Sequence, residues 1–198
     1  DGQDIRDVTQ ESIGHVMGMV LQEPFLFSKS VLENVSYNTE NATREDVVAA
    51  CKIIGAHDFV MQLDEGYDTT LEQRGSNLSV GQRQLLSFAR ALVADPKILV
   101  LDEATANIDS YTERIIQDAL KKLLEGRTAL VIAHRLSTIR NSNQIIVVQD
   151  GEIVEKGTHD ELVSATGLYA QLWQTNYTSF DDIAGNADAI TGAPVSST

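Results

Sequence analysis

A pair of carboxylates follows a short apolar run in the middle of the chain. Asp102 and Glu103 come directly after Ile98-Leu99-Val100-Leu101, whose unbroken apolar character predicts a strand covered on both faces. Open α/β sheets place their ligand sites at the carboxyl ends of strands, where these two acids would lie. Asp102 is a hard oxygen ligand suited to Mg²⁺, and Glu103 has the chemistry to polarise a water molecule beside it. The plain alternative is a solvated strand end, which the neighbouring segments disfavour.

A polar turn precedes this strand and begins an apolar-striped helix. The turn is Leu78-Ser79-Val80-Gly81-Gln82, and Asp95-Pro96 ends the helix, because proline disfavours helical geometry in the residue before it. The apolar residues between them recur at helical spacing: Leu85, Leu86, Ala89, Leu92 and Val93. Exposed N–H groups and the helix dipole attract anions at a helix start, so Ser79 and Gly81 suit an anion site.

Two further apolar runs end in residues with functional side chains. Residues 16–21 predict a buried strand with Gln22 at its carboxyl end, and Thr128–Ala133 predicts another that ends at His134. Taken alone, Gln22 is most simply a solvated loop residue, and His134 a hydrogen-bonded structural residue. The position of His134 after a strand, beside a second strand that ends in two acids, favours a functional role.

The order of these segments resembles the ATP-binding cassette (ABC) ATPases. Residues 78–82 (LSVGQ) are similar to the signature motif of that family, and residues 98–103 (ILVLDE) to its Walker B strand with the catalytic glutamate. Residues 106–109 (ANID) resemble the D-loop, and residues 133–138 (AHRLST) resemble the H-loop. Residues 22–27 (QEPFLF) resemble the Q-loop of ABC exporters. The combination in this order is far more specific than any one of the motifs.

The resemblance covers most of the chain, from residue 1 to about residue 174, and implies an α/β fold. This is the P-loop NTPase (ABC ATPase) fold, a three-layer sheet core with an inserted α-helical subdomain, here incomplete at the N-terminus. Residues 1–22 and 94–174 would form part of a RecA-like ATPase core, and residues 23–93 the helical subdomain that carries the signature. The composition then becomes small, polar and acidic, so we expect residues 175–198 to be a disordered tail.

The resemblance implies ATP and Mg²⁺ as cofactors and assigns catalytic roles to single residues. Glu103, His134 and Gln22 would be catalytic, with the glutamate acting on the attacking water and the histidine meeting the γ-phosphate. Asp102 and Gln22 would contact the Mg²⁺ ion. In the intact domain these groups would hydrolyse ATP and drive transport of a substrate across a membrane.

The resemblance also implies a head-to-tail pair of domains, because the signature contacts the ATP that a partner domain holds. Ser79, Gly81 and Gln82 would therefore contact the partner's nucleotide, and Asp109 would bridge the two domains. The implied partners are a second nucleotide-binding domain and the transmembrane domains of an exporter. Such a chain would lie at the cytoplasmic face of the cell membrane.

The sequence departs from the family pattern at several points. Val80 replaces the usual glycine of the signature, and Glu72-Gln73-Arg74-Gly75 stands where exporters usually have Gly-Glu-Arg-Gly. No Gly-x-x-x-x-Gly-Lys-Ser/Thr segment, the P-loop that holds the β- and γ-phosphates, occurs in the sequence. The chain opens with Asp1-Gly2, a hairpin dipeptide that needs a strand on each side. We therefore expect an N-terminally truncated domain that alone binds MgATP very weakly and hydrolyses it negligibly.

Local signals place the remaining elements. A capping pair at Thr43 predicts a helix that Gly55 ends, and residues 57–63 suggest another. Asp150-Gly151 predicts a hairpin between two short strands, and Thr158 predicts the start of a short helix.

Composition narrows the class of protein. The 198 residues carry a formal net charge of −14, which disfavours a nucleic-acid surface because phosphate backbones need basic patches. The single cysteine, Cys51, leaves no internal disulfide, and no apolar run is long enough to span a membrane. Two alternatives stay open: an ABC ATPase that does not transport, and a non-catalytic half that completes a partner's ATP site.

Overall fold

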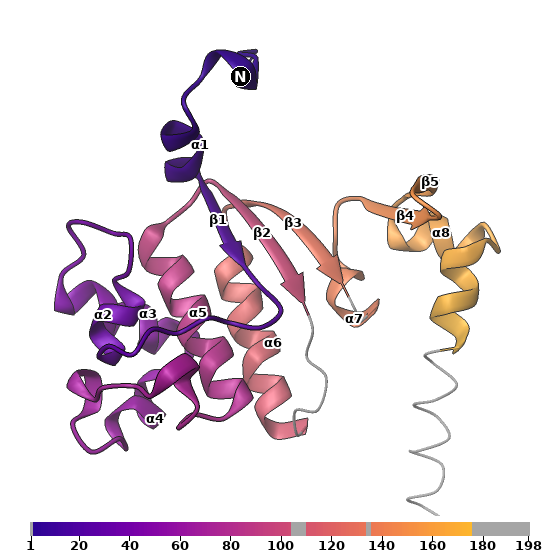
Figure 1. The fold of residues 1–198 in the computed structure, drawn as a ribbon. Coiled ribbons are helices and arrows are strands. Elements are labelled where there is room, and N and C mark those ends of the chain that lie inside the picture. Colours follow the sequence, from indigo (N-terminus) through magenta and orange to yellow (C-terminus); the bar gives the residue numbers. More distant parts are fainter. Residues whose placement is uncertain (1, 104–109, 134–135, 176–198) are drawn as a thin grey trace, which may run out of the picture. The chain divides into compact units, whose positions relative to one another are not determined.

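The computed structural model describes residues 2–103, 110–133 and 136–175 (Figure 1). The chain forms two compact units, Asp1–His134 and Arg135–Thr198, and each is described here by itself. In the described part of the chain, no helix has the length and apolar character that crossing a membrane would need.

A parallel three-stranded sheet forms the centre of the first unit. Its strands are β1 (Met17–Val20), β2 (Ile98–Glu103) and β3 (Thr128–Ala133), in the order β1-β2-β3. The two predicted strands that end at Glu103 and Ala133 are therefore confirmed, and they are neighbours in the sheet. Since all three strands run in the same direction, their carboxyl ends meet at one edge.

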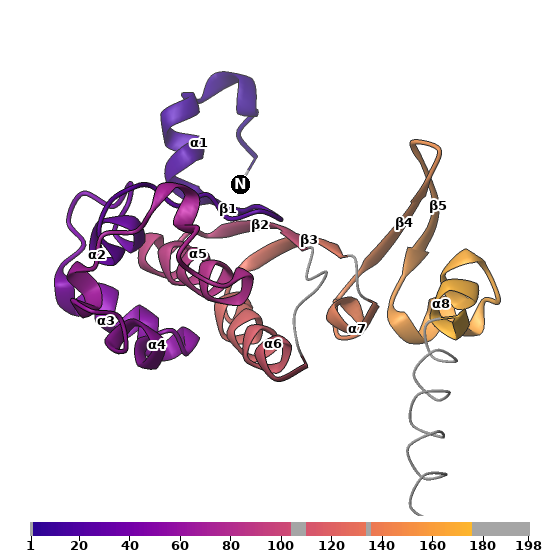
Figure 2. The same ribbon diagram turned by 60° about the horizontal axis from the view of Figure 1, so that its bottom comes forward.

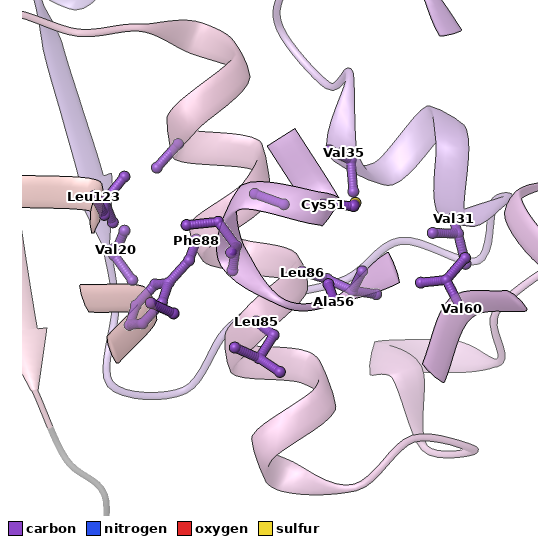
Figure 3. Close-up of a cluster of buried hydrophobic side chains, with 14 of the residues drawn as sticks. Val20, Val31, Val35, Cys51, Ala56, Val60, Leu85, Leu86, Phe88 and Leu123 are labelled. Carbon is purple, nitrogen blue, oxygen red and sulfur yellow. The ribbon is translucent and has the colours of Figure 1, made fainter. Parts of the chain in front are cut away.

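Helices α5 (Val80–Ala94) and α6 (Ser110–Leu124) cover one face of this sheet (Figure 2). The buried side chains on that side come from both helices and from alternate strand residues, and Val20, Leu85, Phe88 and Leu123 are among those shown in Figure 3. Helix α5 ends at Asp95, which adopts a left-handed conformation with φ of 42° before the buried Pro96. The predicted helix and its stop are thus confirmed.

The opposite face of the sheet remains exposed, and here the sequence-based expectation is wrong. Met19 is 61% exposed, Leu130 59% and Ile132 53%, although all three were expected in covered strands. Ile98 lies on the same face, as its pairing with Met17 and Thr128 shows, and it is 40% exposed. The reason is positional: within the described ranges, the two long helices that pack on the sheet both lie on its other side.

A helical region lies between β1 and β2 in the sequence. It contains α2 (Val31–Val35), α3 (Arg44–Ile54) and α4 (His57–Met61), with short 3-10 turns at Gly66–Asp68 and Gln73–Gly75. Thr43 and Asp46 form the predicted capping box of α3, and Gly55 ends that helix with φ of 85°. Cys51 faces the core and is fully buried, and burial raises the pKa of its thiol to about 11.

The N-terminal segment is helical, which corrects the hairpin expected at Asp1-Gly2. A 3-10 turn (Ile5–Asp7) and helix α1 (Gln10–Val16) lie between Gly2 and β1, so no strand directly follows Gly2 to form a hairpin. The cause is local capping. The Asp4 carboxylate accepts a hydrogen bond from the backbone N–H of Arg6, and Thr9 caps α1 by accepting one from Ser12.

The second unit consists of α7 (Leu136–Ile139), β4 (Ile145–Gln149), β5 (Glu152–Gly157), α8 (His159–Ser164) and helical residues 168–175. Strands β4 and β5 form the predicted hairpin around Asp150 and Gly151, whose φ angles of 52° and 85° give the turn its left-handed backbone. The capping box at Thr158 is also present. The expected tail at 175–198 falls almost entirely outside the described residues.

Candidate functional site

The carboxyl edge of the three-stranded sheet brings together three of the segments that the sequence singled out. Val20 pairs with Leu101, so Gln22 and Glu103 each lie two residues beyond the same pair. Glu103 in turn pairs with Ala133, the last residue of β3. The predicted His134 follows Ala133 directly in the chain, but it lies outside the described residues, as does Asp109 of the D-loop-like segment.

Asp102 lies on the less covered face of β2, which leaves its side chain half-buried. Its partner in the register is Ile132, an exposed residue, whereas the preceding Leu101 is buried beneath the sheet. Gln22 is exposed just after β1. Mg²⁺ in nucleotide sites takes one or two protein carboxylates and completes its shell with water and phosphate oxygens, so the donor chemistry of Asp102 fits that ion.

The signature-like turn begins α5 through a reciprocal capping box. The Ser79 hydroxyl oxygen accepts a hydrogen bond from the backbone N–H of Gln82 at 3.2 Å. The Gln82 side-chain oxygen accepts one from the backbone N–H of Ser79 at 2.9 Å. Two of the predicted ligands therefore hold the first turn of the helix in place, while Val80 points outward and is 44% exposed.

Gly81 has a packing role that the sequence did not reveal. A Cβ atom at this position would lie 2.3 Å from Cγ2 of Thr112 in the first turn of α6, so any larger residue would force Thr112 or its helix to shift. The starts of α5 and α6 can approach each other this closely because residue 81 has no side chain. This contact could not be predicted from the sequence, because Thr112 lies in a different helix and no local pattern relates the two positions.

The first turn of α5 lies level with the carboxyl end of β2. Helix α5 has 15 residues and β2 has 6. Their lengths are therefore about 22 Å and about 20 Å, from the rise per residue of a helix and of a strand. Only residues 95–97 join them, so the helix runs antiparallel to the strand. Ser79 therefore lies at the same end of the unit as the acid pair, in the helical layer.

Arg90 and Asn34 hold the segment that follows Gln22 against α5, and sequence reasoning missed this contact. The Arg90 guanidinium donates hydrogen bonds to the backbone oxygens of Asn34 (2.7 Å) and Phe25 (2.9 Å) and to Oδ1 of Asn34 (3.2 Å). It also lies 5.9 Å from the ring centroid of Phe27 and 5.7 Å from that of Tyr37. Burial lowers the pKa of Arg90, and Asn34 is fully buried beside it.

The exporter-like stretch at residues 72–75 is fixed by backbone conformation. Arg74 and Gly75 both have positive φ angles, 58° and 67°. A Cβ at Gly75 would lie 2.9 Å from Cδ1 of Leu26, which explains the glycine. The Glu72 carboxylate accepts a hydrogen bond from the Ser76 hydroxyl at 2.7 Å, so this carboxylate is hydrogen-bonded within the turn itself.

Comparison with known proteins identifies the family. The family model described as "ABC transporter" matches residues 1–106. The chain is 50% identical over 177 residues to an uncharacterized ABC transporter ATP-binding protein, YfiC, of Bacillus subtilis, covering 89% of this chain and 29% of that protein. It is 45% identical over 177 residues to an ATP-dependent lipid A-core flippase of Syntrophus aciditrophicus, covering 89% of this chain and 30% of the flippase.

A solved structure shows the same fold. The structure of a bacterial Atm1-family ABC exporter with ATP bound aligns with a TM-score of 0.80 and 41% sequence identity, over 88% of this chain and 31% of the exporter. The chain thus spans just under a third of the length of these relatives. The fold is that of a P-loop NTPase of the ABC exporter type, and the chain belongs to the ABC transporter family.

Proposed function

We propose that these residues act as the C-terminal part of the ATP-binding domain of an ABC exporter, in which ATP hydrolysis drives substrate transport across a membrane. The observation that carries the proposal is the shared carboxyl edge, where the ends of β1, β2 and β3 meet level with the first turn of α5. The similarity to an ATP-dependent flippase and to an ATP-bound exporter supports the same function.

The acid pair and its neighbours would carry the chemistry. Asp102 would hold the ion, and bound Mg²⁺ would supply neutralisation of the charge on the phosphates. Glu103, the next residue, would act as the base that orients the attacking water. Gln22 would contact both the ion and that water, and His134 would meet the γ-phosphate.

The first turn of α5 would serve the nucleotide of a second domain. Ser79 is exposed at a helix start, where free N–H groups and the dipole favour a phosphate. Gly81 would bring the backbone close, Gln82 would fix the turn beside it, and Asp109 would bridge the two domains. A head-to-tail pair follows, because one domain would then supply the acids and the other the helix start.

Two further components complete the proposal. Since the sequence contains no P-loop motif, the 198 residues alone would bind MgATP very weakly and would not turn it over. The phosphate-holding loop and the transmembrane domains would come from other parts of the exporter. The ATP-binding domain would then work at the cytoplasmic face of the membrane.

The decisive test is Glu103→Gln in the full-length protein that contains this chain, purified in lipid nanodiscs. Loss of a general base lowers turnover by about 10²–10⁴-fold, so we expect the hydrolysis rate to fall by that factor while ATP binding remains. The matched control is Glu125→Gln, an exposed carboxylate after α6, which should leave the rate unchanged. Wild-type protein without ATP-dependent phosphate release, or a Glu103→Gln variant as active as wild type, would refute the proposal.

A further inference from the structure

Arg83 holds the backbone on both sides of Ser79, the residue proposed above to contact a partner's nucleotide. Its guanidinium Nη1 donates a hydrogen bond to the backbone oxygen of Leu78 at 2.6 Å. Its backbone N–H donates another to the backbone oxygen of Ser79 at 3.0 Å. A single residue therefore contacts the carbonyl group before the Cα atom of Ser79 and the carbonyl group after it.

The peptide group between Leu78 and Ser79 is held at its other end as well. The Ser79 N–H donates a hydrogen bond to the side-chain oxygen of Gln82 at 2.9 Å, so both polar groups of this peptide have partners. The orientation of the peptide determines the direction in which the serine side chain projects. The Ser79 hydroxyl oxygen accepts a hydrogen bond from the Gln82 N–H, and a hydroxyl that accepts in this way can still donate its own proton to a ligand.

Arg83 also joins this turn to the segment before it. A Cβ atom at Gly75 would lie 3.3 Å from Cδ of Arg83, so the arginine stem packs on the glycine backbone. Nη1 lies 3.4 Å from the Gly75 oxygen, which also accepts a hydrogen bond from the Leu78 N–H at 2.9 Å. Leu78 is only 5% exposed, so water has little access to its carbonyl group. Without the guanidinium, that carbonyl would lose its hydrogen bond and the peptide could turn away.

We propose that Arg83 is a positioning residue for Ser79, and that it aims the serine hydroxyl by fixing the Leu78–Ser79 peptide. The inference rests on the function proposed above, in which Ser79 contacts a phosphate of the partner's ATP. Hydrogen bonds weaken steeply when their angle departs from linearity, so a small rotation of this peptide would weaken that contact. Arg83 needs no contact of its own with the nucleotide, because its guanidinium is directed back toward residues 75–78.

The test is a double-variant cycle in the full-length protein that contains this chain and carries Glu103→Gln, so that ATP binds without turnover. The variants are Ser79→Ala, Arg83→Met and the two together. Methionine keeps an unbranched apolar stem but has no hydrogen-bond donor. The readouts are the dissociation constant of radiolabelled ATP in the presence of Mg²⁺, measured in lipid nanodiscs, and the melting temperature.

Arg127→Met is the matched control. The Arg127 guanidinium also donates a hydrogen bond to a backbone oxygen of a helix, that of Leu123 at 2.8 Å. Arg127 directly precedes β3, so it lies at the amino end of the strands, away from Ser79. The control variant should have a lowered melting temperature and an unchanged dissociation constant for ATP.

For Ser79→Ala we expect the dissociation constant to rise about tenfold, the effect of losing one hydrogen bond to a charged group. Arg83→Met should raise it about threefold or more, as expected for residues of one hydrogen-bond network. The double variant should match Ser79→Ala alone, because Arg83 has nothing left to position once the hydroxyl is gone. Should Arg83→Met fail to fold, Arg83→Gln replaces it with the same expected outcomes, since its amide is too short to reach the Leu78 oxygen.

Three results would overturn the role of Arg83. They are an unchanged dissociation constant in Arg83→Met, effects of Ser79→Ala and Arg83→Met that multiply in the double variant, and an equal rise in Arg127→Met. The last result would mean that lost stability alone weakens binding. If Ser79→Ala binds ATP as tightly as the parent protein, the proposed contact between Ser79 and the partner's nucleotide fails as well. The two failures are therefore distinguishable.

Discussion

The two faces of the β1-β2-β3 sheet have the same kind of sequence but different surroundings. On one face, Leu99 and Leu101 are buried beneath α5 and α6, while on the other, Met19, Leu130 and Ile132 are exposed. A sheet with one face in water normally alternates apolar and polar residues, whereas these strands are apolar on both sides. These strands therefore have the composition of a sheet that is covered on both faces, although the described residues cover only one face.

Truncation of one leucine on each face gives the largest expected difference. Leu99→Ala removes a fully buried side chain, so the free energy of unfolding of the 198-residue chain should fall by about 2–5 kcal/mol. Leu130→Ala, on the exposed face of the adjacent strand, should change it by less than about 0.5 kcal/mol. Urea denaturation followed by circular dichroism measures both values. Equal losses for the two variants would show that the exposed face is covered in solution.

The signature-like turn repeats the comparison on a smaller scale, since Gly81 is packed and Val80 is exposed. Gly81→Ala introduces a methyl group against Thr112, so we expect a loss of about 1–3 kcal/mol, as for other overpacked sites. Val80→Ala should have little effect. The double variant Gly81→Ala/Thr112→Ser should recover part of the loss, because it removes the methyl group that the new Cβ would meet. Thermal melts test this, and an additive double variant would contradict the contact.

The smallest expected effect concerns Asp46, an exposed residue whose carboxylate accepts hydrogen bonds within the capping box of α3. Hydrogen bonds from the backbone and hydroxyl of Thr43 lower the pKa of Asp46 below its ordinary value of 3.8. Because the folded-state pKa is the lower one, the stabilisation is present above the ordinary value and is lost as pH falls through the lowered one. The stability difference between wild type and Asp46→Ala should therefore be seen at pH 7 and shrink at pH 2. Urea midpoints at the two pH values measure it, and a constant difference would contradict the capping role.

Local signals predicted most elements of the fold and the residues at its carboxyl edge. Capping pairs such as Thr43–Asp46, stops such as Asp95-Pro96 and the hairpin dipeptide at residues 150–151 act over a few residues, so the sequence reveals them directly. The strands that end at Val20 and Glu103 were also predictable from apolar runs. The meeting of their ends followed from the rule that parallel strands share one carboxyl edge.

The features that could not be predicted depend on contacts between distant segments. The hydrogen bond from Arg90 to the Asn34 backbone spans 56 residues, and no local pattern announces it. The glycine at position 81 is explained by Thr112 in another helix, and the exposure of Met19 by the absence of packing over it within the described residues. Partner recognition by the signature-like turn stays a prediction, because it concerns a second domain.

Arg90 also couples the motion of helix α5 to that of the segment that contains Phe25 and Asn34. Its guanidinium ties the backbone at Phe25 and Asn34 to the helix that begins after Ser79. A force applied to Phe25, which is 48% exposed, would therefore reach the start of α5 through hydrogen bonds and helical backbone rather than through a flexible loop. This rigid connection depends on the planar guanidinium group of Arg90. A lysine has a single nitrogen, which cannot reproduce the spacing with which the guanidinium contacts the Phe25 and Asn34 backbone oxygens, so the connection between the two segments would weaken.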